Sequence, residues 1–255
     1  MSTIDMNQAL QIKRASIYLD ACFLLILSDK SDPRYNNIKN LTQTWGLNNN
    51  HVGISNHVYG EVVHNFFFRQ IFEVLYLRTK ERAGHTLTAN QLSKIGDRGL
   101  ADKLITLAGN RAVRAYVAYV DDILAGRARR IDSIYQFHRL RISSIIKQLK
   151  KDASYVSTYR THLNFHYEAA ADLFDVVIKL LKIGYKLDFS WENSDEDLVS
   201  QARNHIAWYQ LDAHDAIHFA VARTNGYEFI VTTDSDYSIS SYTPIIKNTK
   251  IIHIA

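Results

Sequence analysis

The chain has 255 residues, 47% of them hydrophobic and 11% aromatic, which is enough apolar material for one large or two small folded domains. Its single cysteine excludes an intramolecular disulfide, and no apolar run reaches the roughly 18 residues that a membrane-spanning helix needs. The formal charge of +4 is modest and excludes little by itself. Residues 1–16 contain no apolar stretch of the signal-peptide type, so we expect a cytoplasmic protein with no membrane partner.

The first predicted element is a buried strand in the apolar run ASIYLDACFLLIL, residues 15–27. The run is too continuous for a half-exposed strand, which favours a parallel sheet covered on both faces. Its one charged residue is Asp20. Because Asp20 follows the strand-like IYL, we expect it to emerge at the carboxyl edge of the sheet.

Helix and strand patterns then alternate. Residues 34–47 place apolar and polar side chains at helical spacing, and HVGIS, residues 51–55, predicts a short strand. Asn56 is a suitable N-cap for the next helix, which we place over residues 56–77. Glu61 is expected near the start of that helix.

A long helical insertion is predicted in the middle of the chain, because residues 79–210 contain almost no β-rich run. We place this insertion at residues 81–204 and expect it to be all-helical. Its amphipathic segments predict helices over residues 111–126, 131–150, 159–183 and 195–208.

The last part of the chain returns to alternating helix and strand. Residues 211–226 predict a helix that ends at a glycine, and residues 228–237 and 250–254 predict strands. Since strands precede and follow the insertion with helices between them, the connections are crossovers and the sheet is parallel. The predicted fold class is therefore α/β, with residues 1–80 and 205–255 forming one core around a central parallel sheet flanked by helices.

Two acidic residues follow buried strands, where open parallel sheets bind their ligands. Asp20 follows IYL, and Asp234 follows FIVTT. An unpaired carboxylate in apolar surroundings is costly, and the usual remedy is a hydrogen-bonded partner or a metal ion. Mg²⁺ and Mn²⁺ prefer oxygen ligands and can activate water for phosphodiester hydrolysis. We therefore expect Mg²⁺ or Mn²⁺ at this edge of the sheet.

Four segments resemble the motifs of the PIN-domain ribonuclease family, in the order of that family. IYLDACFLL resembles the strand with the first acid, SNHVYGEVV the helix opened by a glutamate, LDAHDAIHFAVARTNG the helix of the third acid, and EFIVTTDSDY the closing Thr-x-Asp-x-Asp motif. The resemblance covers residues 1–80 and the last 45 residues, and it implies a PIN-like fold. By position it implies catalytic and metal-binding roles for Asp20, Glu61, Asp215 and Asp234, a metal-binding role for Asp236, and supporting roles for Thr232 and Asp212.

The activity that the resemblance implies is metal-dependent hydrolysis of RNA by an endoribonuclease. An antitoxin partner is compatible with this chemistry, because the family includes toxins of toxin–antitoxin pairs. The alternative is a catalytically inactive PIN-like module that binds RNA or protein, and a homo-oligomer is left open. Two features depart from the family: Cys22 stands where many relatives carry Asn, Ser or Thr, and the long insertion is unlike the compact members.

Some of these residues also fit three other kinds of active site. His214 and His218 flank Asp215 one helical turn apart, as in the HExxH motif of zinc proteases, but the glutamate is an aspartate and no third ligand is evident downstream. The run DSD alone also fits a nucleotide-sugar transferase. An aspartyl phosphatase needs a second aspartate two positions after Asp20, where Cys22 stands.

A basic segment lies within the insertion. Residues 111–151 contain ten Lys and Arg against three acids, a net charge of +7, while the remainder of the chain is net −3. Segregated positive charge is the expected footprint of a phosphate-backbone partner, so RNA is the predicted partner. An ordinary solvated helix face is the alternative. The residues expected to contact RNA are Arg127, Arg129, Arg130, Arg139 and Arg141.

Overall fold

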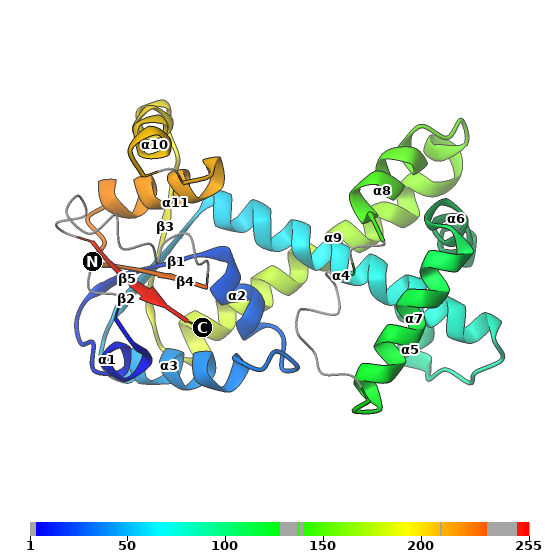
Figure 1. The fold of residues 1–255 in the computed structure, drawn as a ribbon, viewed down its shortest axis with the longest axis horizontal. Coiled ribbons are helices and arrows are strands. Elements are labelled where there is room, and N and C mark those ends of the chain that lie inside the picture. The colour runs from blue at the N-terminus through cyan, green and yellow to red at the C-terminus, as the bar shows by residue number, and fades with distance from the viewer. Residues whose placement is uncertain (1–3, 128–136, 138–139, 210, 234–248, 255) are drawn as a thin grey trace. The chain divides into compact units, whose positions relative to one another are not determined.

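The computed structural model describes residues 4–127, 137, 140–209, 211–233 and 249–254. The chain forms two compact units. The first, here called the sheet unit, comprises residues 1–63 and 173–255, and the second, the helical unit, comprises residues 64–172. Two long helices, α4 (Asn56–Arg82) and α9 (Arg160–Lys179), belong in part to each unit (Figure 1).

The sheet unit is built around five strands that all pair in parallel. This confirms the predicted α/β class with a central parallel sheet. In the order β3-β2-β1-β4-β5, the chain moves outward from β1 to β3 and then returns to the other side of β1. This reversal makes the β1–β4 boundary a topological switch point, which is where open α/β sheets bind ligands. The strands are β1 (Ser16–Leu19), β2 (His51–Ser55), β3 (Asp188–Glu192), β4 (Phe229–Thr232) and β5 (Lys250–His253).

Helices cover both faces of this sheet, with α1 and α3 on one side and α10 and α11 on the other (Figure 1). The covering explains why the central strands are apolar: Ile17, Tyr18 and Leu19 of β1 are fully buried, and every residue of β4 is buried. The helical elements of the sheet unit, besides the parts of α4 and α9, are α1 (Met6–Leu10), α2 (Ala21–Leu27), α3 (Tyr35–Leu47), the π-helical turn η3 (Leu180–Gly184), α10 (Glu196–Tyr209) and α11 (Ala213–Thr224).

The apolar run at residues 15–27 is two elements, so the prediction of one strand is wrong for its second half. β1 ends at Leu19, and α2 begins at Ala21 with Asp20 as its N-cap. An aspartate that accepts a hydrogen bond from the first turn of a helix also ends the preceding strand. Continuous apolar sequence cannot distinguish a buried strand from a buried helix.

The strand β3 lies inside the range that was predicted as an all-helical insertion, residues 81–204, and that prediction is wrong at this end. β3 pairs with β2 over five residue pairs, from His51 with Asp188 to Ser55 with Glu192. It is an edge strand, with no fully buried residue. The segment DFSWE therefore needs few apolar side chains and gives little strand signal.

The helical unit packs around its own apolar cluster. Val74 and Leu77 of α4 contact Ile95 and Ala101 of the neighbouring helices. Arg78 of α4 forms ion pairs with Glu81 and Asp102, and Lys80 pairs with Asp121. The remaining elements of this unit are α5 (Ala89–Ile95), α6 (Arg98–Ala108), α7 (Asn110–Leu124), α8 (Ile142–Lys150) and the π-helical turn η2 (Tyr155–Tyr159).

The predicted helix over residues 131–150 is found only in part. α8 begins at Ile142, with the non-helical Arg141 before it, while residues 128–136, 138 and 139 lie outside the described part of the chain. The predicted helix at 159–183 is present as α9 with a π-helical turn at each end. In the described ranges, each helix is too short or too polar to cross a membrane.

Candidate metal centre

The carboxylate of Asp20 is held by three hydrogen bonds at the end of β1. Its Oδ1 accepts from the backbone N–H of Ala21 at 2.5 Å, and its Oδ2 accepts from the hydroxyl of Thr232 at 2.9 Å and the thiol of Cys22 at 3.1 Å. Thr232 is the last residue of β4, the strand beside β1. The sheet and the start of α2 therefore fix a buried carboxylate at the switch point.

The side chain of Cys22 forms hydrogen bonds on both sides, to Asp20 and to the residue after β4. Its thiol donates to Asp20, and its sulfur accepts from the backbone N–H of Thr233 at 3.2 Å. Burial raises the pKa of the Cys22 thiol, and the charge of Asp20 raises it further. The thiol therefore stays protonated and acts as a donor, so Cys22 is unsuited to be a nucleophile.

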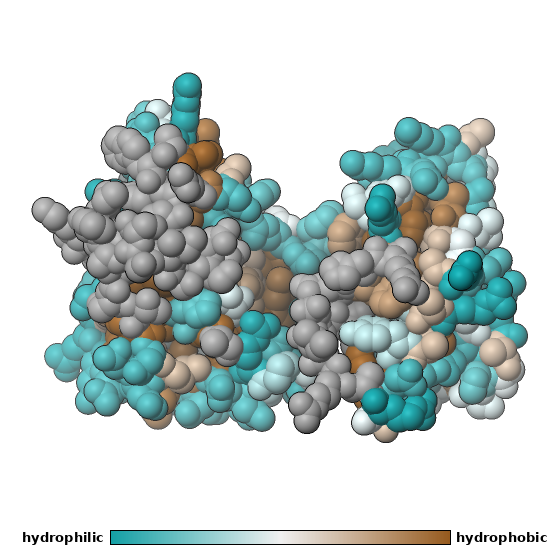
Figure 2. Space-filling view, viewed as in Figure 1, coloured by the Kyte–Doolittle hydropathy of each residue, from teal (hydrophilic) through white to brown (hydrophobic). Residues whose placement is uncertain are grey.

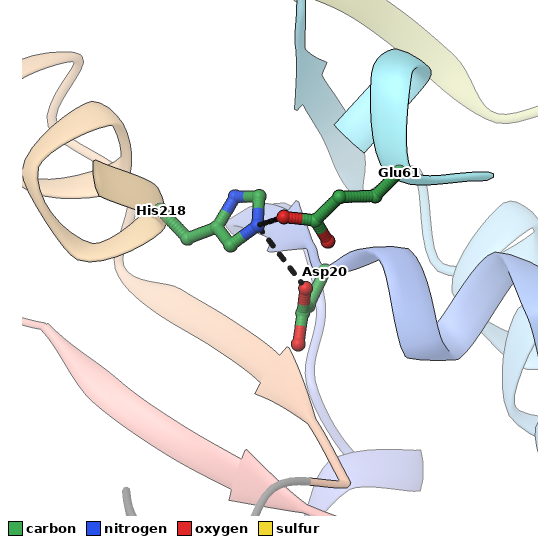
Figure 3. Close-up of side chains that lie close together, drawn as sticks. All are labelled: Asp20, Glu61 and His218. Atoms are coloured by element: carbon green, nitrogen blue, oxygen red, sulfur yellow. Dashed lines mark hydrogen bonds and ion pairs between the residues drawn. The ribbon is translucent and has the colours of Figure 1, made fainter. Parts of the chain in front are cut away.

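Glu61 and His218 meet Asp20 from two further elements. Glu61 lies near the start of α4, and its Oε1 is 3.2 Å from Nε2 of His218 on α11. The same nitrogen is 3.6 Å from Oδ1 of Asp20 (Figure 3). One donor atom from each of the three residues lies within 4.8 Å of the others. Segments far apart in the sequence thus bring two carboxylates and one imidazole together.

The electrostatics of this group favour charge on Glu61 and on His218. Burial alone would lower the pKa of His218, but the hydrogen bond to Glu61 and the charges of Asp20, Glu61 and Asp215 raise it above its ordinary value. Burial would raise the pKa of Glu61, yet the hydrogen bond from His218 and the charges of nearby histidines hold it below its ordinary value. The carboxylates are therefore arranged to face a positive charge.

The second ring nitrogen of His218 is held by a buried hydrogen-bond chain. Its Nδ1 is 3.0 Å from the hydroxyl of Tyr18 on β1, and that hydroxyl is 2.7 Å from Oγ of Ser55 on β2. Tyr18 and Ser55 are both fully buried. This chain determines which way the imidazole ring faces, because a second hydrogen bond fixes both the orientation and the tautomer of a histidine.

Comparisons of the chain with protein-family models, with curated proteins and with solved structures give no match. What the site can bind must therefore be inferred from the donor atoms of its side chains. Two carboxylates and an imidazole are suitable ligands for a divalent cation, and three protein ligands leave positions for water or substrate. The buried Asp20 and His218, together with the half-buried Glu61, could therefore hold a metal ion.

Asp215 and Asp212 occupy the start of α11, one turn before His218. Asp212 is the N-cap, and its Oδ1 accepts from the backbone N–H of Asp215 at 2.9 Å. Asp215 is buried, and its charge contributes to the raised pKa of His218. The group of mutually close donors includes His218 and not Asp215. The other two predicted ligands, Asp234 and Asp236, lie outside the described residues.

Sequence reasoning did not include His218 among the metal ligands. The available signal was the pair His214 and His218, which was compared only with zinc proteases. In the structure both histidines approach Oε1 of Glu61, each at 3.2 Å, but His214 is largely exposed while His218 is buried. The signal that the sequence did contain is the position of His218, three residues after Asp215 and so on the same face of the predicted helix.

Of the five arginines predicted to contact RNA, Arg127 and Arg141 are described. Arg127 is exposed but pairs with Asp122 at 2.7 Å, which neutralises part of its charge. Arg141 is exposed just before α8. The other three, Arg129, Arg130 and Arg139, lie outside the described residues.

Proposed function

We propose that this chain is a metal-dependent endoribonuclease with a PIN-like sheet unit. The observation that carries the proposal is the convergence of Asp20, Glu61 and His218 at the topological switch point of a parallel sheet. Two of these residues are acids that the PIN resemblance selects. A metal site in this place is suited to hydrolysis, because open α/β sheets bind their ligands at the carboxyl ends of the strands.

The distribution of charge supports a polyanionic substrate. The helical unit, residues 64–172, contains 18 Lys and Arg against 10 Asp and Glu, which gives 18 − 10 = +8. The sheet unit has the remaining 12 basic and 16 acidic residues, which gives 12 − 16 = −4. This separation of charge suits two tasks: the basic helical unit would bind the phosphate backbone, and the acidic sheet unit would bind the cation.

The exposed face of α8 is the best-defined part of this basic surface. Arg141, Lys147 and Lys151 are exposed, and each lacks a carboxylate partner among the described side chains. Ser144 and Gln148 lie on the same side of the helix, and the surface over α8 is largely hydrophilic (Figure 2). Uncompensated cations beside hydroxyl and amide groups suit contacts with phosphate and sugar.

Each protein group in this proposal has a defined task. A divalent cation would supply an activated water and would stabilise negative charge on the leaving oxygen of the phosphodiester. Asp20, oriented by Thr232 and Cys22, and Glu61 would hold that cation together with His218. By resemblance, Asp215, Asp234 and Asp236 would complete the acidic set.

The test is incubation of the purified chain with mixed RNAs in Mn²⁺, in Mg²⁺ and in EDTA. We expect cleavage with a divalent ion and none in EDTA. Asp20→Asn should lower the rate by at least about 100-fold, because it removes a ligand while an asparagine can still cap α2. The matched control is Asp175→Asn, which changes an exposed carboxylate on α9 and should leave the rate unchanged.

The alternative of an inactive binding module makes a different prediction for the same samples. Such a module would bind RNA in gel-shift assays but would release no shorter products with any divalent ion. If cleavage occurs equally in EDTA, or if Asp20→Asn cleaves as fast as the unchanged chain, the proposed function is wrong.

A further inference from the structure

The donor atom of His218 lies near those of Glu61 and Asp20 at distances close to the spacing of ligands around one ion. Ligand atoms about 2.1 Å from a metal and about 90–110° apart lie about 3.0–3.4 Å from one another. Nε2 of His218 is 3.2 Å from Oε1 of Glu61 and 3.6 Å from Oδ1 of Asp20. The distance to Glu61 lies within this range, and the distance to Asp20 exceeds it by about 0.2 Å, so a small shift of either side chain brings all of these atoms into one coordination shell (Figure 3).

The buried chain behind His218 leaves Nε2 available to bind a cation. The hydroxyl of Tyr18 carries one proton and two lone pairs, so it can both donate and accept a hydrogen bond. That hydroxyl can donate to Oγ of Ser55 while its oxygen accepts from Nδ1–H of His218. A cation that binds here displaces the proton of Nε2, while Nδ1 keeps the proton that it donates to Tyr18, so the lone pair of Nε2 then points toward Asp20 and Glu61. Metal-binding histidines ordinarily have such a partner on the other nitrogen.

We propose that Nε2 of His218 is a ligand of the catalytic cation and that it makes the site select a first-row transition-metal ion, such as Mn²⁺, over Mg²⁺. The inference rests on the proposed metal-dependent function and narrows it to a class of ion. Mg²⁺ prefers oxygen ligands throughout its shell, whereas imidazole favours transition metals. A site made of carboxylates alone would have no nitrogen ligand to favour Mn²⁺ over Mg²⁺.

Equilibrium binding of MnCl₂ and of MgCl₂ to the metal-free full chain, measured by calorimetry, tests the selectivity directly. The unchanged chain should bind Mn²⁺ at least about 10-fold more tightly than Mg²⁺. His218→Gln replaces the nitrogen with an amide oxygen, so it should weaken Mn²⁺ binding by about 10-fold or more and change Mg²⁺ binding little. An unchanged ratio of the two affinities in this variant overturns the proposal, as does the absence of binding of either ion to the unchanged chain.

Two further variants test whether the change in metal affinity comes from His218 as a ligand or from altered charge near Glu61. His214→Gln changes an exposed histidine at the same distance from Glu61 but outside the group of three donors, so the ratio of affinities should stay as it is. Tyr18→Phe keeps the shape of the buried ring but removes the partner of Nδ1. It should lower Mn²⁺ affinity by about 10-fold, the usual effect of losing such a partner, with a smaller effect on Mg²⁺.

A spectroscopic measurement on the unchanged chain does not depend on whether any variant folds. Pulsed electron paramagnetic resonance of bound Mn²⁺ should detect coupling to the nitrogen of an imidazole, and its absence overturns the proposal. The result is separable from the proposed function. Nitrogen coupling without RNA cleavage refutes the nuclease and keeps the ligand, whereas metal-dependent cleavage without nitrogen coupling keeps the nuclease and refutes the ligand.

Discussion

The pKa values of two buried histidines, His218 and His166, are shifted in opposite directions because their neighbours differ. His218 is 2% exposed beside two carboxylates, and its pKa is raised. His166, in the helical unit, is equally buried, but among the described residues its Nδ1 pairs with a neutral group, the amide oxygen of Gln70, at 3.4 Å. Burial, and to a lesser degree the charge of His162, lowers the pKa of His166 to about 4. A neutral neighbour cannot offset the cost of removing a charged imidazole from water.

His166 should therefore make the helical unit sensitive to acid. Between pH 6.5, its ordinary pKa, and pH 4, the unfolded chain binds a proton at residue 166 that the folded chain does not. The free energy of unfolding should fall across this window by up to about 3 kcal/mol from this one group, with no contribution above it. His166→Gln should remove that part of the pH dependence. Urea unfolding above pH 6.5 and near pH 4 measures it.

The neighbouring His162 provides the control for this prediction. Its charge is the smaller cause of the lowered pKa of His166, so His162→Gln should remove much less of the pH dependence than His166→Gln does. Equal acid sensitivity in the His166→Gln variant and the unchanged chain would show that His166 is protonated in the folded state.

The candidate site shows which residues can be predicted from sequence and which cannot. Asp20 was selected because it follows a buried strand, and Glu61 mainly because SNHVYGEVV resembles a PIN-domain motif. His218 was not selected, since its role depends on three contacts across the sheet unit, to Asp20, Glu61 and Tyr18. Tyr18 was likewise predicted only as part of an apolar strand. A partner about 160 to 200 positions away leaves no local pattern in the sequence.

At the scale of elements, two helical glycines have opposite surroundings. Gly46 lies in α3 against the backbone of Tyr185, and a β-carbon added there would collide with the carbonyl oxygen of that residue. Gly60 lies in α4 with no atom within 4 Å of the same position. The close approach of α3 to the segment after η3 thus requires a glycine at position 46.

The pair Gly46→Ala and Gly60→Ala should change stability in opposite directions. Gly60→Ala should raise the free energy of unfolding by roughly 0.5–1 kcal/mol, because alanine loses less backbone freedom in a helix. Gly46→Ala should lower it by about 1–3 kcal/mol through overpacking. Thermal unfolding of both variants in EDTA checks this. A Gly46→Ala variant as stable as the unchanged chain would contradict the close contact with Tyr185.

Elements were predicted well where burial is complete on one face and poorly elsewhere. β2 was placed at its observed bounds, and α11 was found because small apolar residues recur on its buried side. β3 was missed because it is an edge strand, which pairs with β2 alone and buries little of its side-chain surface. The boundary between β1 and α2 was missed because both elements are buried, so their apolar side chains form one unbroken run.

At the scale of the whole molecule, the two units carry opposite charge, +8 for the helical unit and −4 for the sheet unit. If the helical unit binds the RNA backbone, affinity must depend on its free cations and on salt. Replacing Arg141, Lys147 and Lys151 with glutamine removes up to three phosphate contacts. The slope of log affinity against log salt should become shallower by up to about 2, at about 0.7 per contact on single strands. Fluorescence titrations of a single-stranded RNA in EDTA at several salt concentrations measure this slope.

The matched control removes the same number of charges from cations that are already paired. Lys94, Arg98 and Arg127 are bound to Glu73, Glu81 and Asp122 respectively, so their replacement with glutamine should change the slope less. Cleavage at saturating RNA should be equal in both triple variants, because binding strength then no longer limits the rate. Equal slopes for both variants would assign RNA affinity to net charge alone. A loss of turnover at saturation in the α8 variant would instead place that face of α8 in the cleavage step.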